Sequence, residues 1–158
     1  MKQTIGAVLA AKADDAALFT VDAGGTVRDA VEVLNAQGIG AVLIRNEDGL
    51  IDGIFTERDL LRRVVHPRLD PDATPISMAM TRDVRFVGPS DSVEASLALM
   101  YVNRFRHLLV MDGPRVLGLV SIRDMTDHLL RHGEGRFEAA VRDAAGENPA
   151  PEHAEGDN

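Results

Sequence analysis

Cysteine and tryptophan are absent from this chain of 158 residues, and tyrosine occurs once. Without cysteine the protein can form neither disulfides nor cysteine zinc sites, and thiol catalysis is excluded. Aromatic residues make up only 4% of the sequence, whereas apolar residues as a whole make up 45%. Aliphatic side chains and methionine must therefore fill the core of an otherwise ordinary globular composition.

Long apolar runs and a surplus of positive charge are also missing. No apolar segment approaches the roughly 20 residues needed to cross a bilayer. The stretch from Met1 to Ala13 lacks the basic segment and apolar core of a secretion signal, so we expect no membrane contact and a cytoplasmic location. The formal charge of −8 argues against a nucleic-acid partner, because nonspecific affinity comes from cations that neutralise phosphates.

The sequence contains few of the motifs that mark enzymes. The glycine-rich pieces Ala23 to Gly25 and Gly38 to Gly40 lack the lysine of a P-loop and the spacing of a dinucleotide fingerprint. No serine stands in a nucleophile elbow. His128 and His132 have helical i, i+4 spacing but no evident third ligand. We therefore expect a protein that is not an enzyme and holds no metal.

What the sequence does contain is an internal repeat. The segment from Thr26 to Ile44 aligns without gaps on the segment from Ser92 to Val110. After one residue is dropped in the following turn, GIFTERDLL from Gly53 aligns with GLVSIRDMT from Gly118. A repeat of this length indicates two copies of one supersecondary unit, which cannot bury its apolar face alone.

Each copy is predicted to form a β-α-β-β-α unit. In the first copy, Thr26 caps a helix that ends at Gly38, and the turn from Asn46 to Gly49 joins a hairpin. The predicted strands are Leu18 to Val21, Ala41 to Arg45 and Leu50 to Phe55 in the first copy, and Val84 to Val87, His107 to Met111 and Arg115 to Val120 in the second.

These units predict an α+β fold. Each three-stranded sheet has one face to cover, so we expect the two repeats to pack sheet to sheet about a pseudo-twofold axis, with clefts between the halves. The expected division is repeat 1 over residues 1–66, a proline-rich linker over 67–75 and repeat 2 over 76–132. A C-terminal helix, from about Gly135 to Ala145, and an acidic disordered tail occupy 133–158.

Several motifs carry a resemblance to a known family. They are the two Gly-x-φ-[Thr/Ser]-x-x-Asp segments, the pair Met80-Thr81, and the strands GIGAVLI and RFRHLLV. On these residues the chain resembles a tandem CBS-domain (cystathionine beta-synthase domain) pair, similar to bacterial proteins that contain little else, over nearly the whole span from Thr4 to Arg131. The resemblance implies a Bateman-type module that binds adenosyl compounds in its clefts, forms a homodimer and regulates a partner.

The resemblance also implies roles for individual residues. The ribose would be held by Thr56, Asp59, Ser121 and Asp124. The adenine would be flanked by Ile39, Gly40, Ala41, Arg106, His107 and Leu108, with Thr81 and Val84 completing a second pocket. The phosphates would meet Arg58 and Arg123, the latter standing where the family often has glycine.

Each of these signals has an alternative interpretation. A [Thr/Ser]-x-x-Asp segment is also a capping box that stabilises the start of a helix. Arg58 and Arg123 lie in the first helical turn, where the dipole disfavours a cation unless a phosphate binds there. Arg62 and Arg63 extend the basic cluster or form a solvated face. Of Arg106 and the adjacent His107, alternation along a strand predicts that only one points into the cleft.

Two functions follow as hypotheses. In the first, the chain is a regulatory sensor that needs no resident cofactor, binds AMP, ADP, ATP or a related adenosyl ligand, and passes a conformational change to an unknown protein partner. In the second, it is a ligand-independent dimeric scaffold, with the two motifs retained as helix caps. Alanine at Asp59 and Asp124 distinguishes them, because only the sensor would lose ligand binding.

Overall fold

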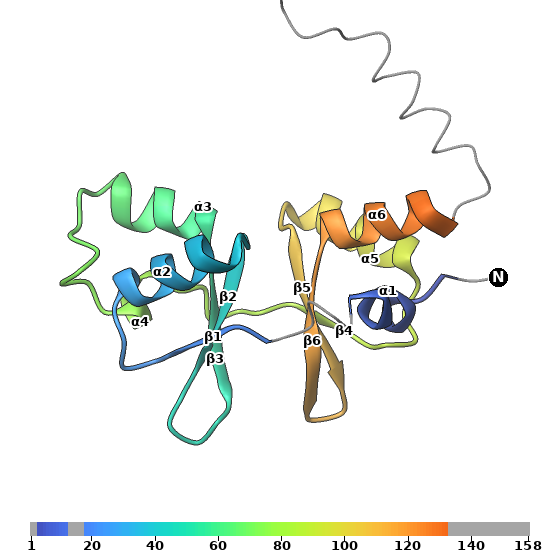
Figure 1. Ribbon diagram of the computed structural model, residues 1–158, viewed down its shortest axis with the longest axis horizontal. Helices are drawn as coiled ribbons and strands as arrows, with labels where there is room; N and C mark the ends of the chain where they lie inside the picture. Colours follow the sequence, from blue (N-terminus) through green and yellow to red (C-terminus); the bar gives the residue numbers. More distant parts are fainter. Residues whose placement is uncertain (1–2, 13–17, 133–158) are drawn as a thin grey trace, which may run out of the picture.

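The computed structural model describes residues 3–12 and 18–132, which form two similar halves. Each half contains a three-stranded sheet, and the two sheets face each other in the middle of the molecule with helices on the outer sides (Figure 1). The strands of the first sheet are β1 (Thr20–Asp22), β2 (Ala41–Arg45) and β3 (Ile51–Thr56), and those of the second are β4 (Phe86–Val87), β5 (His107–Asp112) and β6 (Arg115–Ser121).

The two sheets have the same topology. In each, the first strand runs parallel to the second, and the second pairs antiparallel with the third. The register shifts between Ile44 and Arg45 in β2, and between Val110 and Met111 in β5. These positions are equivalent in the two copies, so the repeat in the sequence is confirmed down to the position of its bulge.

The outer helices bury one apolar stripe each. Helix α2 (Val27–Gln37) follows the capping box of Thr26 and ends at Gly38, and α5 (Val93–Asn103) is capped by Ser92. The remaining elements are α1 (Ile5–Ala11), α3 (Glu57–Asp59), the π-helix η1 (Leu60–Val65), α4 (Ile76–Ala79) and α6 (Ile122–His132). Each half thereby has its own core, one around Phe55 and one around Leu108.

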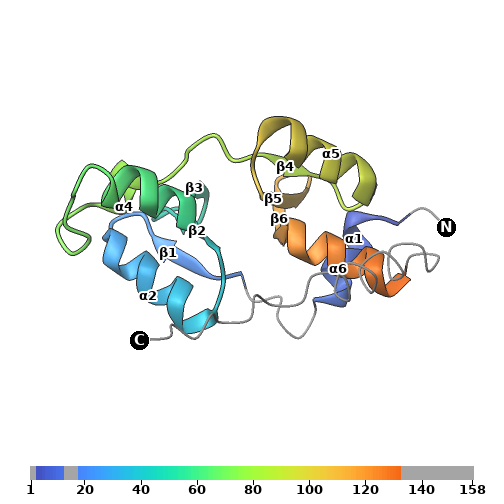
Figure 2. The same ribbon diagram turned by 90° about the horizontal axis from the view of Figure 1, so that it is seen from above.

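Two short helices each precede one repeat in the sequence but pack on the other repeat. Helix α4 precedes the second copy but contacts α2 and η1 of the first, while α1 precedes the first copy but contacts α6 and β6 of the second (Figure 2). Ile5 and Val8 of α1 are fully buried there, as is Ile76 of α4 in the first half. The two halves therefore exchange their leading helices.

Matching backbone contacts hold the exchanged helices. Thr4, the N-cap of α1, forms a β-bridge with Ser92, the N-cap of α5. Pro75, the N-cap of α4, forms the equivalent bridge with Thr26, the N-cap of α2. The first amides of a helix lack acceptors within it. Next to these bridges, the N–H of Val27 in α2 donates to the carbonyl of Thr74, and the N–H of Val93 in α5 donates to the carbonyl of Gln3.

A third apolar layer lies between the two sheets. It contains Ala41, Leu43 and Ile54 from the first sheet and Leu109 from the second, all buried. This layer confirms that the two repeats of the α+β fold pack sheet to sheet. The clefts described below open beside it.

The structure corrects several sequence predictions. Leu18 and Val84, predicted to begin strands, lie before β1 and β4 and pack into the layer between the sheets instead. The helix after Thr56 changes to π-helical geometry at Leu60, and α1 was not foreseen. The predicted C-terminal helix lies outside the described residues. Within residues 3–12 and 18–132, no helix has the length and apolarity that a membrane crossing requires.

Candidate functional site

A cavity of about 690 Å³ opens between the halves beside the start of α6. We call it the Ser121 cleft. Its second-half wall carries Ser121, Arg123 and Asp124, and its first-half wall is the segment from Gly38 to Ala41. Leu9 and Lys12, at the end of the exchanged helix α1, form a third side. The volume lies within the range of small-molecule sites.

A second cavity, of about 410 Å³, opens beside the start of α3. We call it the Thr56 cleft. Thr56, Arg58 and Asp59 line it from the first half, and Phe105 lines it from the second. The segment that follows the exchanged helix α4 contributes Thr81, Asp83, Val84 and Arg85. The two clefts are thus built alike, each from one [Thr/Ser]-x-x-Asp motif, the opposite half and the end of an exchanged helix.

In the Thr56 cleft the motif aspartate is fully engaged by protein groups. Asp59 Oδ2 accepts hydrogen bonds from the backbone N–H and the hydroxyl of Thr56, at 3.0 and 3.1 Å. Its Oδ1 accepts from the hydroxyl of Thr81 at 3.0 Å and lies 3.6 Å from Arg63 Nε. With only 11% of its side chain exposed, Asp59 acts as the reciprocal half of a capping box.

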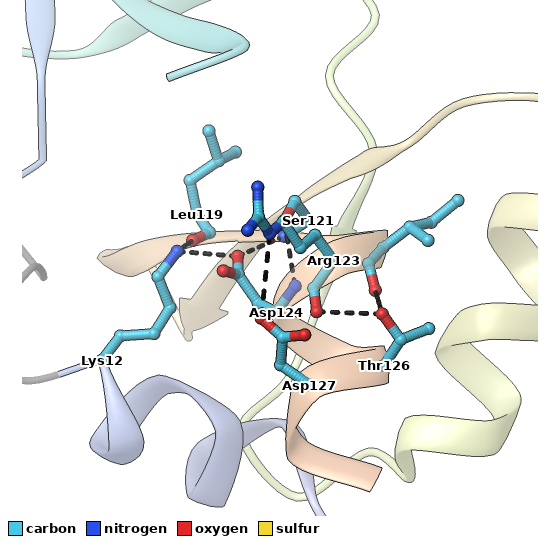
Figure 3. A network of polar contacts seen from close by, with 8 residues as sticks. Lys12, Leu119, Ser121, Arg123, Asp124, Thr126 and Asp127 are labelled. Atoms are coloured by element: carbon cyan, nitrogen blue, oxygen red, sulfur yellow. Dashed lines mark hydrogen bonds and ion pairs between the residues drawn. The ribbon is translucent and has the colours of Figure 1, made fainter. Parts of the chain in front are cut away.

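In the Ser121 cleft the equivalent aspartate, Asp124, has contacts with Ser121 and Lys12 (Figure 3). Asp124 Oδ2 accepts from the backbone N–H of Ser121 at 2.7 Å and from Lys12 Nζ at 2.7 Å. From the described part of the chain, no hydrogen bond reaches Oδ1. The Asp124 side chain is 21% exposed. This carboxylate therefore keeps one oxygen that a ligand hydroxyl can reach.

The two clefts share a wall. Gly40, Glu57, Arg106 and His107 line both cavities. The His107 ring lies beside Gly40 on this wall, and β5 begins at His107. Burial, and then the charge of Arg106, lower the pKa of His107 from 6.5 to about 4, so that the imidazole is neutral at pH 7.

The arginines near the motifs have different environments. Arg58 reaches across the Thr56 cleft and donates to the carbonyl of Arg104 at 2.6 Å. Arg63 donates to the carbonyl of Met80 at 2.6 Å and so supports the exchanged helix α4. Arg62 lines the Thr56 cleft and is exposed. Arg123, by contrast, is 89% exposed at the rim of the Ser121 cleft, 3.8 Å from Asp127.

The structure brings nearly all of the predicted site residues to one cleft or the other. Leu108 is the exception, because its side chain is buried in the core of the second half. Lys12 is the site residue that sequence reasoning missed. It lies 112 positions from Asp124, and no local pattern marks it. In the described residues no group of three or more His, Asp or Glu side chains gathers as a metal site would require.

Two β-α-β-β-α repeats, packed sheet to sheet with two motif-lined clefts between them, define a tandem-repeat module. The family model for the CBS domain matches residues 15–66 and 76–131, and the chain belongs to this family. The fold and the family anticipated from the motifs are thereby confirmed.

Known proteins of several organisms are similar to the chain. A CBS-domain protein of Arabidopsis thaliana is 35% identical over 104 residues, which cover 66% of this chain and 19% of that protein. The chain therefore spans about a fifth of the length of that relative. A 17.7 kDa protein of Acidianus ambivalens is 29% identical over 114 residues, or 72% of this chain and 68% of its own.

Solved structures give the same result. One is described as a putative signal-transduction protein with CBS domains from Burkholderia ambifaria. It superposes with a TM-score of 0.79 at 38% identity, covering 84% of this chain and 97% of that one. A CBS-domain protein from Agrobacterium tumefaciens superposes with a TM-score of 0.74 at 31% identity, covering 80% and 93%. These similarities support a regulatory module as the general class.

Proposed function

We propose that the chain is a sensor that binds an adenosine-containing nucleotide between its CBS repeats and transmits a conformational change to a protein partner. The observation that carries this proposal is the Ser121 cleft, where a partly exposed carboxylate stands opposite the backbone of Ile39, Gly40 and Ala41. A carboxylate accepts hydrogen bonds from both hydroxyls of a ribose. Backbone groups on the opposite wall suit the edge of a planar base.

Of the two clefts, we propose the Ser121 cleft as the principal site. It is the larger, and Asp124 retains an oxygen for a ligand. In the Thr56 cleft, a ribose must displace Thr81 from Asp59, and a phosphate must draw Arg58 from the carbonyl of Arg104. The free energy of these broken protein contacts lowers the affinity of the Thr56 cleft for a nucleotide.

The response to the ligand comes from the position of the clefts between the halves. A ligand shifts a conformational equilibrium only by its difference in affinity for the two states. A nucleotide in the Ser121 cleft touches the first half, the second half and the end of α1 at once. Its binding therefore favours the relative arrangement of the halves that brings these three walls together.

Thermal unfolding with AMP, ADP, ATP and S-adenosylmethionine tests the proposal. A ligand that binds the folded state raises the unfolding temperature in a concentration-dependent manner. We expect a shift that disappears in Asp124→Asn and persists in the matched control Asp127→Asn, whose exposed carboxylate lies on the same helix but does not line the cavity. No shift with any compound at millimolar concentration would favour the scaffold hypothesis.

A homodimer remains part of the proposal, and the scaffold hypothesis requires it as well. Leu99, Tyr101 and Val102 of α5 are exposed, Tyr101 by 85%. Among the methionines, Met80, Met100 and Met125 are buried in the cores, whereas Met78 is exposed. We expect Tyr101→Glu to halve the mass measured by light scattering, since it places a charge on this apolar face. A monomeric mass for the unsubstituted protein at micromolar concentration would contradict the dimer.

A further inference from the structure

The end of an exchanged helix contacts the motif aspartate in both clefts, but with different chemistry. In the Thr56 cleft the hydroxyl of Thr81 donates to Asp59 at 3.0 Å. In the Ser121 cleft the ammonium of Lys12 donates to Asp124 at 2.7 Å. A neutral donor in one cleft thus corresponds to a cation in the other, and only the second changes the charge that a ligand meets.

Lys12 is held at this position by two contacts. Besides the ion pair with Asp124, its Nζ donates to the carbonyl of Leu119 at 3.1 Å (Figure 3). Its side chain is 27% exposed, so water screens the charge only in part. Among the described residues that line this cleft, Lys12 is the only cation with a nitrogen within hydrogen-bond distance of Asp124.

We propose that Lys12 determines the ligand specificity of the Ser121 cleft, by making it select adenosyl ligands that carry phosphate over ligands that carry none. This inference rests on the proposed function. A ribose that donates to both oxygens of Asp124 competes with Lys12 for Oδ2. The ammonium that is displaced then lies in a partly buried cleft without its counter-ion, which is unfavourable.

A phosphate group removes this penalty, because it supplies a new anion for the displaced ammonium. The flexible four-carbon stem of lysine allows Nζ to turn from Asp124 toward that anion. Adenosine supplies no such charge, and S-adenosylmethionine has a net positive charge, because its single carboxylate is outweighed by a sulfonium and an ammonium group. The cleft therefore favours ligands with phosphate over ligands without it, because the phosphate replaces Asp124 as the counter-ion of Lys12. Any attraction from Arg106 and Arg123 at the wall of the cleft adds to this preference.

Titration calorimetry with AMP, adenosine and S-adenosylmethionine tests the inference on the full chain. In Lys12→Gln we expect the Kd of AMP to rise about tenfold, the value of one charged hydrogen bond, while the Kd of adenosine stays unchanged or falls. Lys12→Arg should restore the preference for AMP. Arg28→Gln is the matched control, because it removes one exposed ion-paired cation that lines neither cleft.

The possible outcomes separate the inference from the function on which it rests. If Lys12→Gln leaves the ratio of the AMP and adenosine affinities unchanged, the inference is overturned and the proposed function stands. If the ratio is unchanged because both affinities fall equally, the result assigns Lys12 to the support of α1 alone. If the unsubstituted protein binds none of the three compounds and ADP and ATP also leave its unfolding temperature unchanged, both are overturned. Unfolding temperatures of each variant establish that it is folded.

Discussion

The Thr56 cleft and the Ser121 cleft carry the same motif but differ in what the motif can offer a ligand. Asp59 has contacts to both oxygens, from Thr56, Thr81 and Arg63. Asp124 shares one oxygen between Ser121 and Lys12 and keeps the other accessible. The comparison teaches that the motif guarantees a helix cap, whereas the end of the exchanged helix decides whether the carboxylate is available for binding.

His107 lines both clefts, so it cannot be assigned to one of them. Its protonation is expected to have the largest effect on the free energy of unfolding. The pKa of His107 is about 4 in the folded protein and 6.5 in the unfolded chain. Between these values the unfolded state binds more protons, so stability falls as the pH is lowered from about 6.5 to about 4, by roughly 3 kcal/mol. Urea unfolding across this range measures the loss.

His107→Gln provides the reference for that pH series. Glutamine cannot titrate, so the free energy of unfolding of the variant should lack this component of the pH dependence while retaining that of the carboxylates. Parallel curves for the two proteins between pH 4 and 6.5 would show that His107 is not the group responsible.

Alanine substitution of the motif aspartates sharpens the comparison directly. Asp59→Ala leaves the hydroxyl of Thr81 and the amide of Thr56 without their acceptor, and we expect a loss of about 2–3 kcal/mol in the free energy of unfolding. Asp124→Ala removes a more exposed cap and should cost about 1 kcal/mol. Urea unfolding measures both. A greater loss in Asp124→Ala would reverse the assignment of the two clefts.

Two equivalent glycines test the exchanged helices. A methyl group on Gly53 would lie 2.8 Å from the backbone oxygen of Thr81, whereas on Gly118 it would lie 2.5 Å from the end of the Leu9 side chain. A side chain can rotate away but the backbone cannot, so Gly53→Ala should cost about 2 kcal/mol and Gly118→Ala less than about 1. Thermal unfolding of the pair checks the order, which equal losses would contradict.

The smallest expected effect is a gain in stability. Helix α2 ends at Gly38 with φ of 62°, and α5 ends at Arg104 with φ of 58°. An arginine in this left-handed conformation is strained, so Arg104→Gly should stabilise the protein by about 0.5–1 kcal/mol. The carbonyl that Arg58 uses is retained. A lower unfolding temperature would show that the Arg104 side chain makes a contribution of its own.

Local patterns in the sequence were sufficient for most of the fold. The cap Thr26, the end of α2 at Gly38 and the strands of both hairpins were predicted because each depends on residues close together in the chain. The uncovered face of each predicted sheet indicated the sheet-to-sheet packing with clefts between the halves, and the family resemblance added the ligand class and the roles of the site residues. Leu18 and Val84 misled the strand prediction because their burial comes from the facing sheet and not from a ladder of their own.

The rest depended on contacts between distant segments. The exchange of α1 and α4 arises from bridges such as the one between Thr4 and Ser92, which no periodicity encodes. Lys12 is paired with a residue 112 positions away. The motifs therefore indicated where a ligand would bind, but not which of the two carboxylates is free to bind it.

The exchanged helices have a consequence for how the chain folds. The first half cannot complete its core until α4 has been reached, and the second cannot complete its core without α1 from the other end of the described chain. Contacts this distant raise the contact order and slow folding, since loop closure must precede the gain from packing. The repeats are consequently expected to form in one cooperative transition, with neither half persisting as a folding intermediate on its own.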